Sequence, residues 1–359
     1  MSSDTIQKHK QTPLSRRQRM IVAFVSERGS VSNKDIAARF EVSHATAARD
    51  LKTLLTKEVL IQEGKGRSVR YRESFSHPLL RFIDPDQYFT KEADDRSGVK
   101  ERFDSSVLDH LSGLFSKQEL SELETRNSAY RSRLTKLPSD IVRREFERLT
   151  IDLSWKSSAL EGNTYTLLDT ETLIKEHQEA PGHTREEAQM ILNHKAALDY
   201  VRDARSEFRT LTISKIGTIH DLIVQNLGIT RGLRKTPVGI VGTRYRPLDN
   251  EHQIREALEE TIQRINILTE PFSKTLIAIS LISYIQPFND GNKRTARMVG
   301  DALLLAHDSC PLSFRNMDIA AYKRALILFY EQHSLRLLKE IFIEQFRYAA
   351  THYFLTASS

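Results

Sequence analysis

The stretch from Gln286 to Arg297, which reads QPFNDGNKRTAR, combines residue types that bind phosphate groups. Apolar patterns predict one helix over residues 272–285, before the stretch, and a second over residues 294–306. A loop containing Gly and Asn at the start of a helix offers an anion unpaired backbone N–H groups and the positive end of the helix dipole. Arg294 and Arg297 add charge three residues apart on one helix face, and Asp290 is placed to hold a Mg²⁺ ion that bridges phosphates. These residues predict a polyphosphate site.

The elements that must position this loop are mostly helical. From Ser139 onward long helical patterns dominate, and the only strand-like segment runs from Val238 to Tyr245. The expected fold class is therefore mainly α. A hydrophobic content of 39% with 28% charged residues is typical of a soluble globular protein. The longest apolar run, residues 276–285, has about half the length that crosses a bilayer, so no membrane association is expected.

Cysteine and histidine usage narrows the chemistry further. The single cysteine, Cys310, excludes a disulfide framework and a cysteine-rich zinc site, and it fits a reducing cytoplasm. The first ten residues lack the apolar core of a signal peptide, so we expect a cytoplasmic protein. His177, His183 and His194 do not have the spacing of metal ligands, and His220 is more typical of helix packing than of chemistry.

The first 75 residues have a pattern of their own. Helices are predicted over residues 14–28 and after the caps Ser32 and Ser43. Two short strands then flank the basic glycine turn at 63–67. Three helices and a hairpin make a winged helix-turn-helix, whose third helix would lie in the major groove of DNA. These residues carry fifteen Lys and Arg against eight Asp and Glu, which gives a net charge of +7. Because the whole chain has a net charge of +6, the remaining residues have a net charge of −1. Such asymmetry predicts a polyanion partner for this segment alone.

The segment from Val42 to Arg67, VSHATAARDLKTLLTKEVLIQEGKGR, resembles the winged helix-turn-helix of DeoR-like bacterial repressors. The resemblance covers about 60 residues and implies binding to duplex DNA, although some winged helices bind only proteins. The residues expected to face DNA come from the third helix and the wing, and they are Ser43, His44, Thr46, Arg49, Lys65 and Arg67.

The phosphate loop resembles the signature of the Fic family, also called Fido, which is His-x-Phe-x-(Asp/Glu)-Gly-Asn-x-Arg-x-x-Arg. Every signature position except the first is present, as Phe288, Asp290, Gly291, Asn292, Arg294 and Arg297. Upstream, Ser157-x-x-x-Glu161-Gly162-Asn163 resembles the family's inhibitory motif, on a helix expected near 150–163. The strand-like segment resembles the family's short β-hairpin flap, which clamps target peptides through Ile240, Val241, Gly242 and Thr243. The resemblance spans roughly residues 140–355.

The resemblance implies a function as well as an all-helical Fic fold. Family members usually transfer AMP from ATP to a protein hydroxyl, with a loop histidine as the base. Carried over residue by residue, Asp290 holds Mg²⁺, and a second set of residues binds the nucleotide, namely Phe288, Gly291, Asn292, Lys293, Arg294 and Arg297. The catalytic set is Gln286, Asp290, Asn292 and Arg294. Glu161, with Ser157 on the same helix face, would pair with Arg297 and exclude the γ-phosphate.

Two residues depart from the family pattern. Gln286 stands at the position of the catalytic histidine, and an amide cannot act as a general base near neutral pH. Loss of a general base typically costs about 10²–10⁴-fold in rate. Lys293 stands where most members have Gly. A lysine at this position resembles the related Doc toxins, whose Asn-Lys-Arg loop accompanies phosphate transfer. Lys293 can equally be a tolerated residue at an exposed helix start.

Three domains and three functional hypotheses follow. We expect a winged helix-turn-helix over 1–75, a linker with a helix near 117–128 over 76–138, and a Fic domain over 139–359. The first hypothesis is a self-inhibited protein adenylyltransferase, and the second is a transcriptional regulator that senses ATP without turnover. The third is a Doc-like phosphotransferase held by Glu161. We favour ATP and Mg²⁺ binding linked to DNA-binding regulation, with transfer weak or lost. The expected partners are duplex DNA, a nucleotide and a protein hydroxyl, and a homodimer is a further option.

Overall fold

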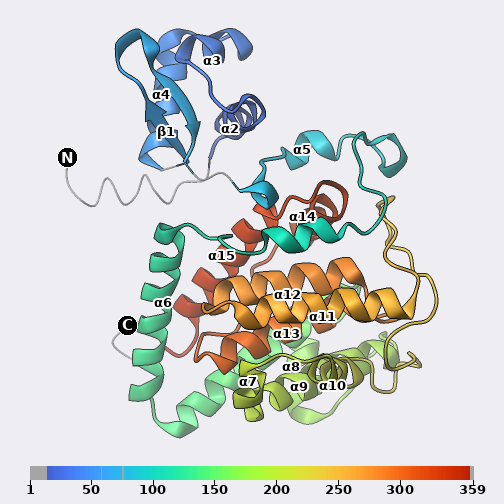
Figure 1. Cartoon of the computed structure of the whole chain (residues 1–359). Helices are drawn as coiled ribbons and strands as arrows, with labels where there is room; N and C mark the ends of the chain where they lie inside the picture. Colours follow the sequence, from blue (N-terminus) through green and yellow to red (C-terminus); the bar gives the residue numbers. More distant parts are fainter. Residues whose placement is uncertain (1–13, 58, 75–76, 356–359) are drawn as a thin grey trace. The chain divides into compact units, whose positions relative to one another are not determined.

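The computed structural model describes residues 14–355, apart from residues 58, 75 and 76 (Figure 1). The chain divides after Glu92 into two compact units. The segment predicted as a linker over 76–138 is divided between the two units. Residues 77–92 belong to the first unit and residues 93–138 to the second.

The first unit contains the three helices and the hairpin that the sequence predicts, followed by a short fourth helix. The cap residues Ser15, Ser32 and Ser43 each accept a hydrogen bond from the backbone of the first helical turn that follows, which fixes where the helices begin. The strands pair antiparallel, with Leu60 opposite Glu73. The elements are α2 (Arg16–Arg28), α3 (Asn33–Arg39), α4 (His44–Thr56), β1 (Leu60–Glu63), β2 (Arg70–Glu73) and the short α5 (Pro85–Tyr88). Their shared core is apolar and includes Ile21, Val25, Ile36, Ala47, Leu51, Leu54 and Leu60.

The second unit is a bundle of helices joined by loops and three short 3₁₀ turns. The predicted helix near 117–128 extends further, to Lys136, and ends just before Pro138, which cannot continue a helix. The helices are α6 (Lys117–Lys136), α7 (Ser139–Ala159), α8 (Leu167–Glu176), α9 (Arg185–Asp203), α10 (Ile213–Ile223), α11 (Glu251–Ile267), α12 (Pro271–Ile285), α13 (Asn292–Ala306), α14 (Ile319–Gln332) and α15 (Arg336–His352). The 3₁₀ turns are η3 (Ala93–Asp95), η4 (Ser105–His110) and η5 (Arg205–Arg209).

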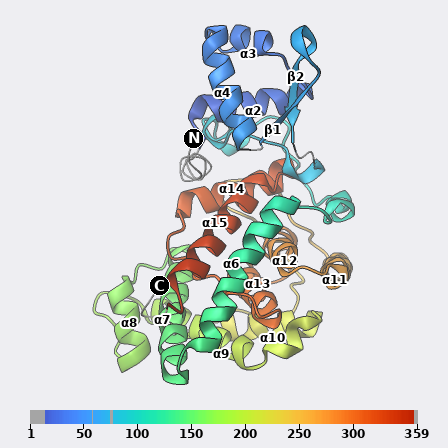
Figure 2. The same ribbon diagram turned by 90° about the vertical axis from the view of Figure 1, so that its left-hand side faces the viewer.

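Helices α12 and α13 form the centre of this unit. Helix α12 is buried from Phe272 to Ile285, and every residue of α13 except Lys293 is buried. Helices α7, α9 and α10 cover one side of this pair, while α14 and α15 cover the other and α6 packs on α15 (Figures 1 and 2). Burying an apolar side chain such as Leu281 stabilises the fold by about 1.5–3 kcal/mol. The loop that joins these two helices, residues 286–291, is therefore held between two rigid ends.

The predicted strand over residues 238–245 is not formed. Within the described residues, only β1 and β2 pair as regular strands. Residues 238–240 have no regular structure, and the chain turns at Val241 and Gly242, where Gly242 has φ 82°. Arg246 forms only an isolated parallel bridge with Arg102. A β-hairpin flap was therefore the wrong expectation, because the backbone here pairs with a segment distant in sequence instead of with itself.

No helix in the described ranges combines the length and the apolar character needed to cross a bilayer.

Candidate functional site

The phosphate loop begins and ends with left-handed backbone. Gln286 ends α12 with φ 51°, and Gly291 precedes α13 with φ 77°. A Cβ atom on Gly291 would lie 2.9 Å from Cγ1 of Val224, so only glycine fits both the conformation and the space. The first backbone hydrogen bond of α13 runs from Thr295 N to Gly291 O. The amides of Asn292, Lys293 and Arg294 therefore lie at the helix start, where an anion finds its donors.

The side chain of Asn292 holds the loop in shape. Its Oδ1 accepts a hydrogen bond from Phe288 N at 2.8 Å, and its Nδ2 donates to Phe288 O at 2.8 Å. The ring of Phe288 is stacked on His220, with centroids 3.7 Å apart. His220 is fully buried and its Nε2 donates to Asp290 O at 3.0 Å, while burial lowers its pKa and keeps the ring neutral. Because its side chain is used within the loop, Asn292 can meet a phosphate only through its backbone N–H, and His220 packs against the loop.

Arg234 is a residue that sequence reasoning missed. It is fully buried, and its Nε donates to Gln286 O at 2.6 Å. Its other guanidinium nitrogens donate to the carbonyls of Thr236 and Leu248, and its backbone N donates to Pro287 O at 3.0 Å. One buried arginine therefore fixes the start of the phosphate loop to the segment that follows α10. No local pattern signals this role, because its partners in the loop, Gln286 and Pro287, are about 50 residues away.

The two arginines of the loop are buried with unused donors. Arg294 and Arg297 are 3% and 1% exposed, and Nη1 of each has no hydrogen-bond partner among the described residues. Arg294 Nη2 donates to Asp290 Oδ2 at 3.0 Å, and the Asp290 side chain is 67% exposed. A buried guanidinium with a free N–H is costly unless a partner arrives, and a phosphate group is the partner that fits best.

Glu161 occupies the place of such a partner. Arg297 Nη2 donates to Glu161 Oε1 at 3.0 Å, and Lys293 Nζ lies 3.2 Å from Oε2. Arg297 is held further by Ser157, whose Oγ and O accept hydrogen bonds at 2.9 Å. Burial alone would raise the pKa of Glu161, but the charges of Arg297 and Lys293 outweigh it and lower the pKa to about 2. The carboxylate is therefore ionised across the physiological range.

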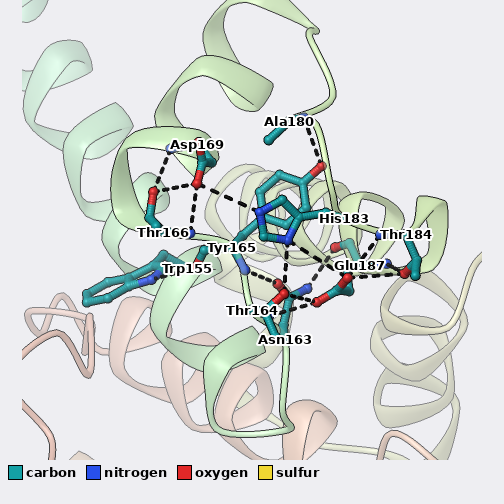
Figure 3. Close-up of polar contacts among 10 residues, drawn as sticks. All are labelled: Trp155, Asn163, Thr164, Tyr165, Thr166, Asp169, Ala180, His183, Thr184 and Glu187. Carbon is teal, nitrogen blue, oxygen red and sulfur yellow. Dashed lines mark hydrogen bonds and ion pairs between the residues drawn. The ribbon is translucent and has the colours of Figure 1, made fainter.

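The loop that follows Glu161 is fixed by the start of α9 (Figure 3). Glu187 accepts hydrogen bonds from the N–H and hydroxyl of Thr164 through Oε1, and from those of Thr184 through Oε2. Asn163 Nδ2 donates to Glu187 O at 2.8 Å, and the Tyr165 ring contacts the tilted His183 ring with centroids 4.2 Å apart. Hydrogen bonds from Thr184 N–H, and then from Thr164, lower the pKa of Glu187 to about 2. This network holds the turn that presents Glu161.

A cavity of about 320 Å³ brings most of the predicted residues together. The predicted residues that line it are Glu161, Ile240, Val241, Gln286, Asp290, Gly291, Asn292 and Lys293. Further lining residues come from α14 and include Lys323, Leu326, Ile327 and Tyr330. Among the residues predicted for the phosphate loop, the inhibitory motif and the flap, those that do not line the cavity are Ser157, Gly242, Thr243, Phe288, Arg294 and Arg297.

The side chain of Gln286 has a defined orientation in this cavity. Its Nε2 donates to Ser283 O at 2.7 Å, which turns the amide back toward the end of α12. Its Oε1 has no hydrogen-bond partner within the described residues. Gln286 can therefore accept a hydrogen bond from a hydroxyl, but it has no site to which the proton could be transferred.

The residues predicted to bind DNA lie in the first unit, on α4 and the hairpin. His44 Nδ1 and Asn33 Oδ1 form a hydrogen bond of 2.9 Å between α4 and α3, and Arg49 and Lys65 are exposed. Ser43 caps α4 through a hydrogen bond from Thr46 N. Arg67 belongs to the turn between β1 and β2, and its side chain lies outside what the structure describes. Helix α4 thus presents polar side chains, while its other face is buried.

Comparison with known proteins finds a matching family in each unit. Residues 210–304 match the Fic/DOC family, and residues 17–70 match the DeoR-like helix-turn-helix domain. A protein adenylyltransferase Fic of Nematostella vectensis is 25% identical over 208 residues, which is 56% of this chain and 49% of that protein. Protein adenylyltransferase fic-1 of Caenorhabditis elegans is 26% identical over 154 residues, which is 41% of this chain and 30% of that protein. The chain thus spans half or less of the length of these two relatives.

Solved structures with the same fold are found as well. A Fic domain containing signaling protein from Bacteroides thetaiotaomicron has a TM-score of 0.53 at 19% identity, over 64% of this chain and 96% of its own. Fic-1 from C. elegans has a TM-score of 0.53 at 18% identity, over 66% of this chain and 70% of its own. These likenesses establish the fold of the second unit.

Proposed function

Because this chain contains a Fic/DOC family domain and a DeoR-like helix-turn-helix domain, we propose that it binds ATP with Mg²⁺ and links this binding to regulation at duplex DNA. Transfer of AMP to a protein hydroxyl is then weak or lost. The observation that carries the proposal is the pair of buried arginines with unused N–H groups at the start of α13. Glu161 lies beside them in place of an outer phosphate.

The residues of the cavity fit a magnesium nucleotide. The amides at the start of α13 and the two arginines would hold the phosphates. The Asp290 carboxylate is exposed enough to take a hard cation through its oxygens once it leaves Arg294. Mg²⁺ supplies charge neutralisation between the phosphates when bound. The Ile240, Leu326 and Ile327 side chains provide an apolar side for the base.

Gln286 sets the limit on turnover. In AMP transfer a hydroxyl oxygen bonds to the α-phosphorus, the bond to the β-phosphate oxygen breaks, and pyrophosphate leaves while the hydroxyl proton passes to a base. Gln286 cannot accept that proton, and His220 is committed to Phe288 and Asp290. The remaining groups still stabilise charge on the phosphates. ATP can therefore be held without being consumed at an appreciable rate.

Lys293 favours a second candidate function, a self-inhibited transferase of nucleotidyl or phosphoryl groups. It is the one residue of α13 that is not buried, and it reaches both the cavity and Glu161. An ammonium group there would meet the outer phosphate if Glu161 moved away. This candidate keeps Glu161 as an inhibitor and assigns Lys293 a part in placing the transferred group.

One experiment separates these functions. The full chain and its Glu161→Gly variant are incubated with ATP labelled in the α-phosphate and, separately, in the γ-phosphate. Protein label from the α position alone means nucleotidyl transfer, and label from the γ position alone means phosphotransfer. We expect ATP binding by both proteins and little label from either position. An absence of ATP binding by the Glu161→Gly variant would contradict the proposed function.

A further inference from the structure

The cavity wall formed by residues 238–243 has no partner strand, yet four of its residues line the cavity. Val241 is 97% exposed, so the wall is not held by burial of its own side chains. A segment without regular structure is usually mobile unless other contacts fix it. The contacts that fix this wall come from Glu331 on α14 and from Arg96.

Glu331 on α14 is the anchor of the wall. It is completely buried, and its Oε1 accepts a hydrogen bond from Thr243 Oγ1 at 2.6 Å. Thr243 Oγ1 in turn accepts a hydrogen bond from Tyr245 N at 3.0 Å. The wall is thus tied to a helix of the buried bundle through one hydroxyl group.

Arg96 completes the anchor from a second direction. Its Nη1 donates to both carboxylate oxygens of Glu331, at 3.2 and 3.3 Å, and to Gly242 O at 2.9 Å. Arg96 is 8% exposed, so this ion pair is screened from water. One guanidinium therefore neutralises the buried anchor and holds the turn of the wall directly.

The stretch around Arg96, residues 94–102, contacts the end of the wall and the residues that follow it; we call it the entry segment, because the chain enters the second unit there. Arg244 donates to Asp94 O and to Arg96 O, each at 3.0 Å. Arg246 N donates to Glu101 O at 3.0 Å, next to the bridge between Arg102 and Arg246. The entry segment thus supplies carbonyl acceptors for Arg244 and Arg246, the residues that fix the C-terminal end of the wall.

We propose that Arg96 is a positioning residue for the cavity wall, which it holds in shape for a substrate by joining Gly242 to the buried Glu331. The proposal deepens the proposed function, since the wall matters only if the cavity takes a substrate. A buried ion pair that loses one partner leaves an uncompensated charge, so the wall detaches from its anchor when Arg96 is removed. The wall then moves independently of the phosphate loop, which Arg234 holds separately.

The test follows the motion of the wall directly and uses the full chain without nucleotide. A nitroxide spin label is attached to Cys in a Val241→Cys variant. The natural Cys310 does not compete for the label, because it is completely buried and burial raises the pKa of its thiol. Hydrogen exchange of the Arg246 amide, which is bonded to Glu101 O, gives a second readout. Both are measured in Arg96→Ala, Arg96→Lys and Thr243→Val.

The control is Arg315→Ala, which breaks another ion pair to a buried carboxylate, that of Asp152, away from the cavity lining. We expect Arg96→Ala to narrow the spin-label spectrum and to speed exchange at Arg246 on the order of 100-fold. Thr243→Val loses one hydrogen bond to the anchor, so exchange should rise about fivefold with little change in the denaturation midpoint. Arg96→Lys keeps a cation for Glu331 and should restore most of the immobilisation. Arg315→Ala should lower the denaturation midpoint and leave the spectrum unchanged.

An unchanged spectrum in Arg96→Ala would overturn the proposal. Equal narrowing in Arg315→Ala would also overturn it, since the effect would then be general loss of stability. Neither readout needs ATP, so a failure of ATP binding would refute the proposed function and leave this result standing.

Discussion

Replacement of Glu161 by Gly tests whether the carboxylate beside Arg297 is an inhibitor. In the protein as it stands, Glu161 bridges Arg297 at 3.0 Å and Lys293 at 3.2 Å. A γ-phosphate that approaches these cations would meet a negative carboxylate and would have to displace it. The variant removes both the repulsion and the competition, and it leaves Arg297 held by Ser157. ATP should therefore bind more tightly.

The magnitude follows from the strength of the ion-pair network. A pKa lowered from 4.5 to about 2 corresponds to about 3 kcal/mol of preference for the ionised carboxylate in this site. If between one third and all of that interaction must be broken when ATP binds, the affinity of the variant for ATP is higher by between about 5-fold and 150-fold. The gain should be largest for ATP, smaller for ADP and absent for AMP, because only the outer phosphate competes with Glu161.

Titration calorimetry with the three nucleotides measures these affinities, and Glu161→Gln serves as the matched variant that keeps the side-chain shape. The pH dependence has a defined sign. Because the pKa in the folded protein is depressed, the pair contributes its full stability above about pH 4.5 and loses it only as the pH falls toward 2. The ratio of the affinities of variant and wild type should therefore be constant between about pH 6 and pH 8. Equal ATP affinity in both proteins, or an equal gain for AMP, would refute the reasoning.

Three further predictions test the rest of the site. Glu187→Ala should release the turn that presents Glu161 and tighten ATP binding about 3-fold to 10-fold, because hydrogen bonds to a carboxylate contribute about 1.5–3 kcal/mol and only part of this reaches Glu161. The control is Glu186→Ala at the exposed neighbour, and equal ATP affinity in the two variants would show that Glu187 does not position Glu161. The double variant Glu161→Gly/Gln286→His should label protein with AMP about 100-fold faster than Glu161→Gly alone, because a general base typically contributes a rate factor of this size. A double variant that binds ATP but stays slow would show that the loop is not arranged for adenylyl transfer. Lys65→Ala should lower the slope of log affinity for duplex DNA against log salt by roughly one, as expected for one lost phosphate contact, and an unchanged slope in fluorescence anisotropy would exclude Lys65 from the DNA interface.

Much of the site could be predicted because its signals are local. The loop sits between two helices whose apolar patterns are continuous, so the patterns alone place the loop between them. The ion pair between Glu161 and Arg297 was expected from the resemblance, and the structure places the two side chains 3.0 Å apart. The caps Ser32 and Ser43 identify the helix starts of the first unit because a cap is decided by residues within one turn.

Two of the features that escaped prediction depend on distant partners. Residues 238–245 resemble a strand in sequence, but they are held by the entry segment more than 130 residues earlier, through Arg96 on Gly242 O and through the Arg244 side chain on Asp94 O. The role of Arg234 depends on carbonyl groups of Gln286 and Leu248, which no local pattern connects to it. Asn292 was expected to bind the nucleotide, and only the folded loop shows that both polar atoms of its side chain bond to the backbone of Phe288.

The contact of Glu161 with Arg297 and the absence of a base at Gln286 are both consistent with a site that responds to the ATP concentration. An inhibitory carboxylate costs an incoming ATP a fixed free energy, so it raises the apparent Kd by the same factor by which it disfavours the open site. A cost of about 3 kcal/mol, the strength of this ion-pair network, moves a micromolar site toward the 0.1 mM range. A site of that affinity would not be saturated by trace nucleotide, and under the proposed function Gln286 would leave the bound nucleotide unconsumed. We infer that occupancy then follows the ATP concentration, which is the behaviour required of a nucleotide-responsive regulator. Under this reasoning, Glu161→Gly should make DNA binding insensitive to ATP concentrations over which the natural protein responds, and an unshifted response in an anisotropy titration would contradict it.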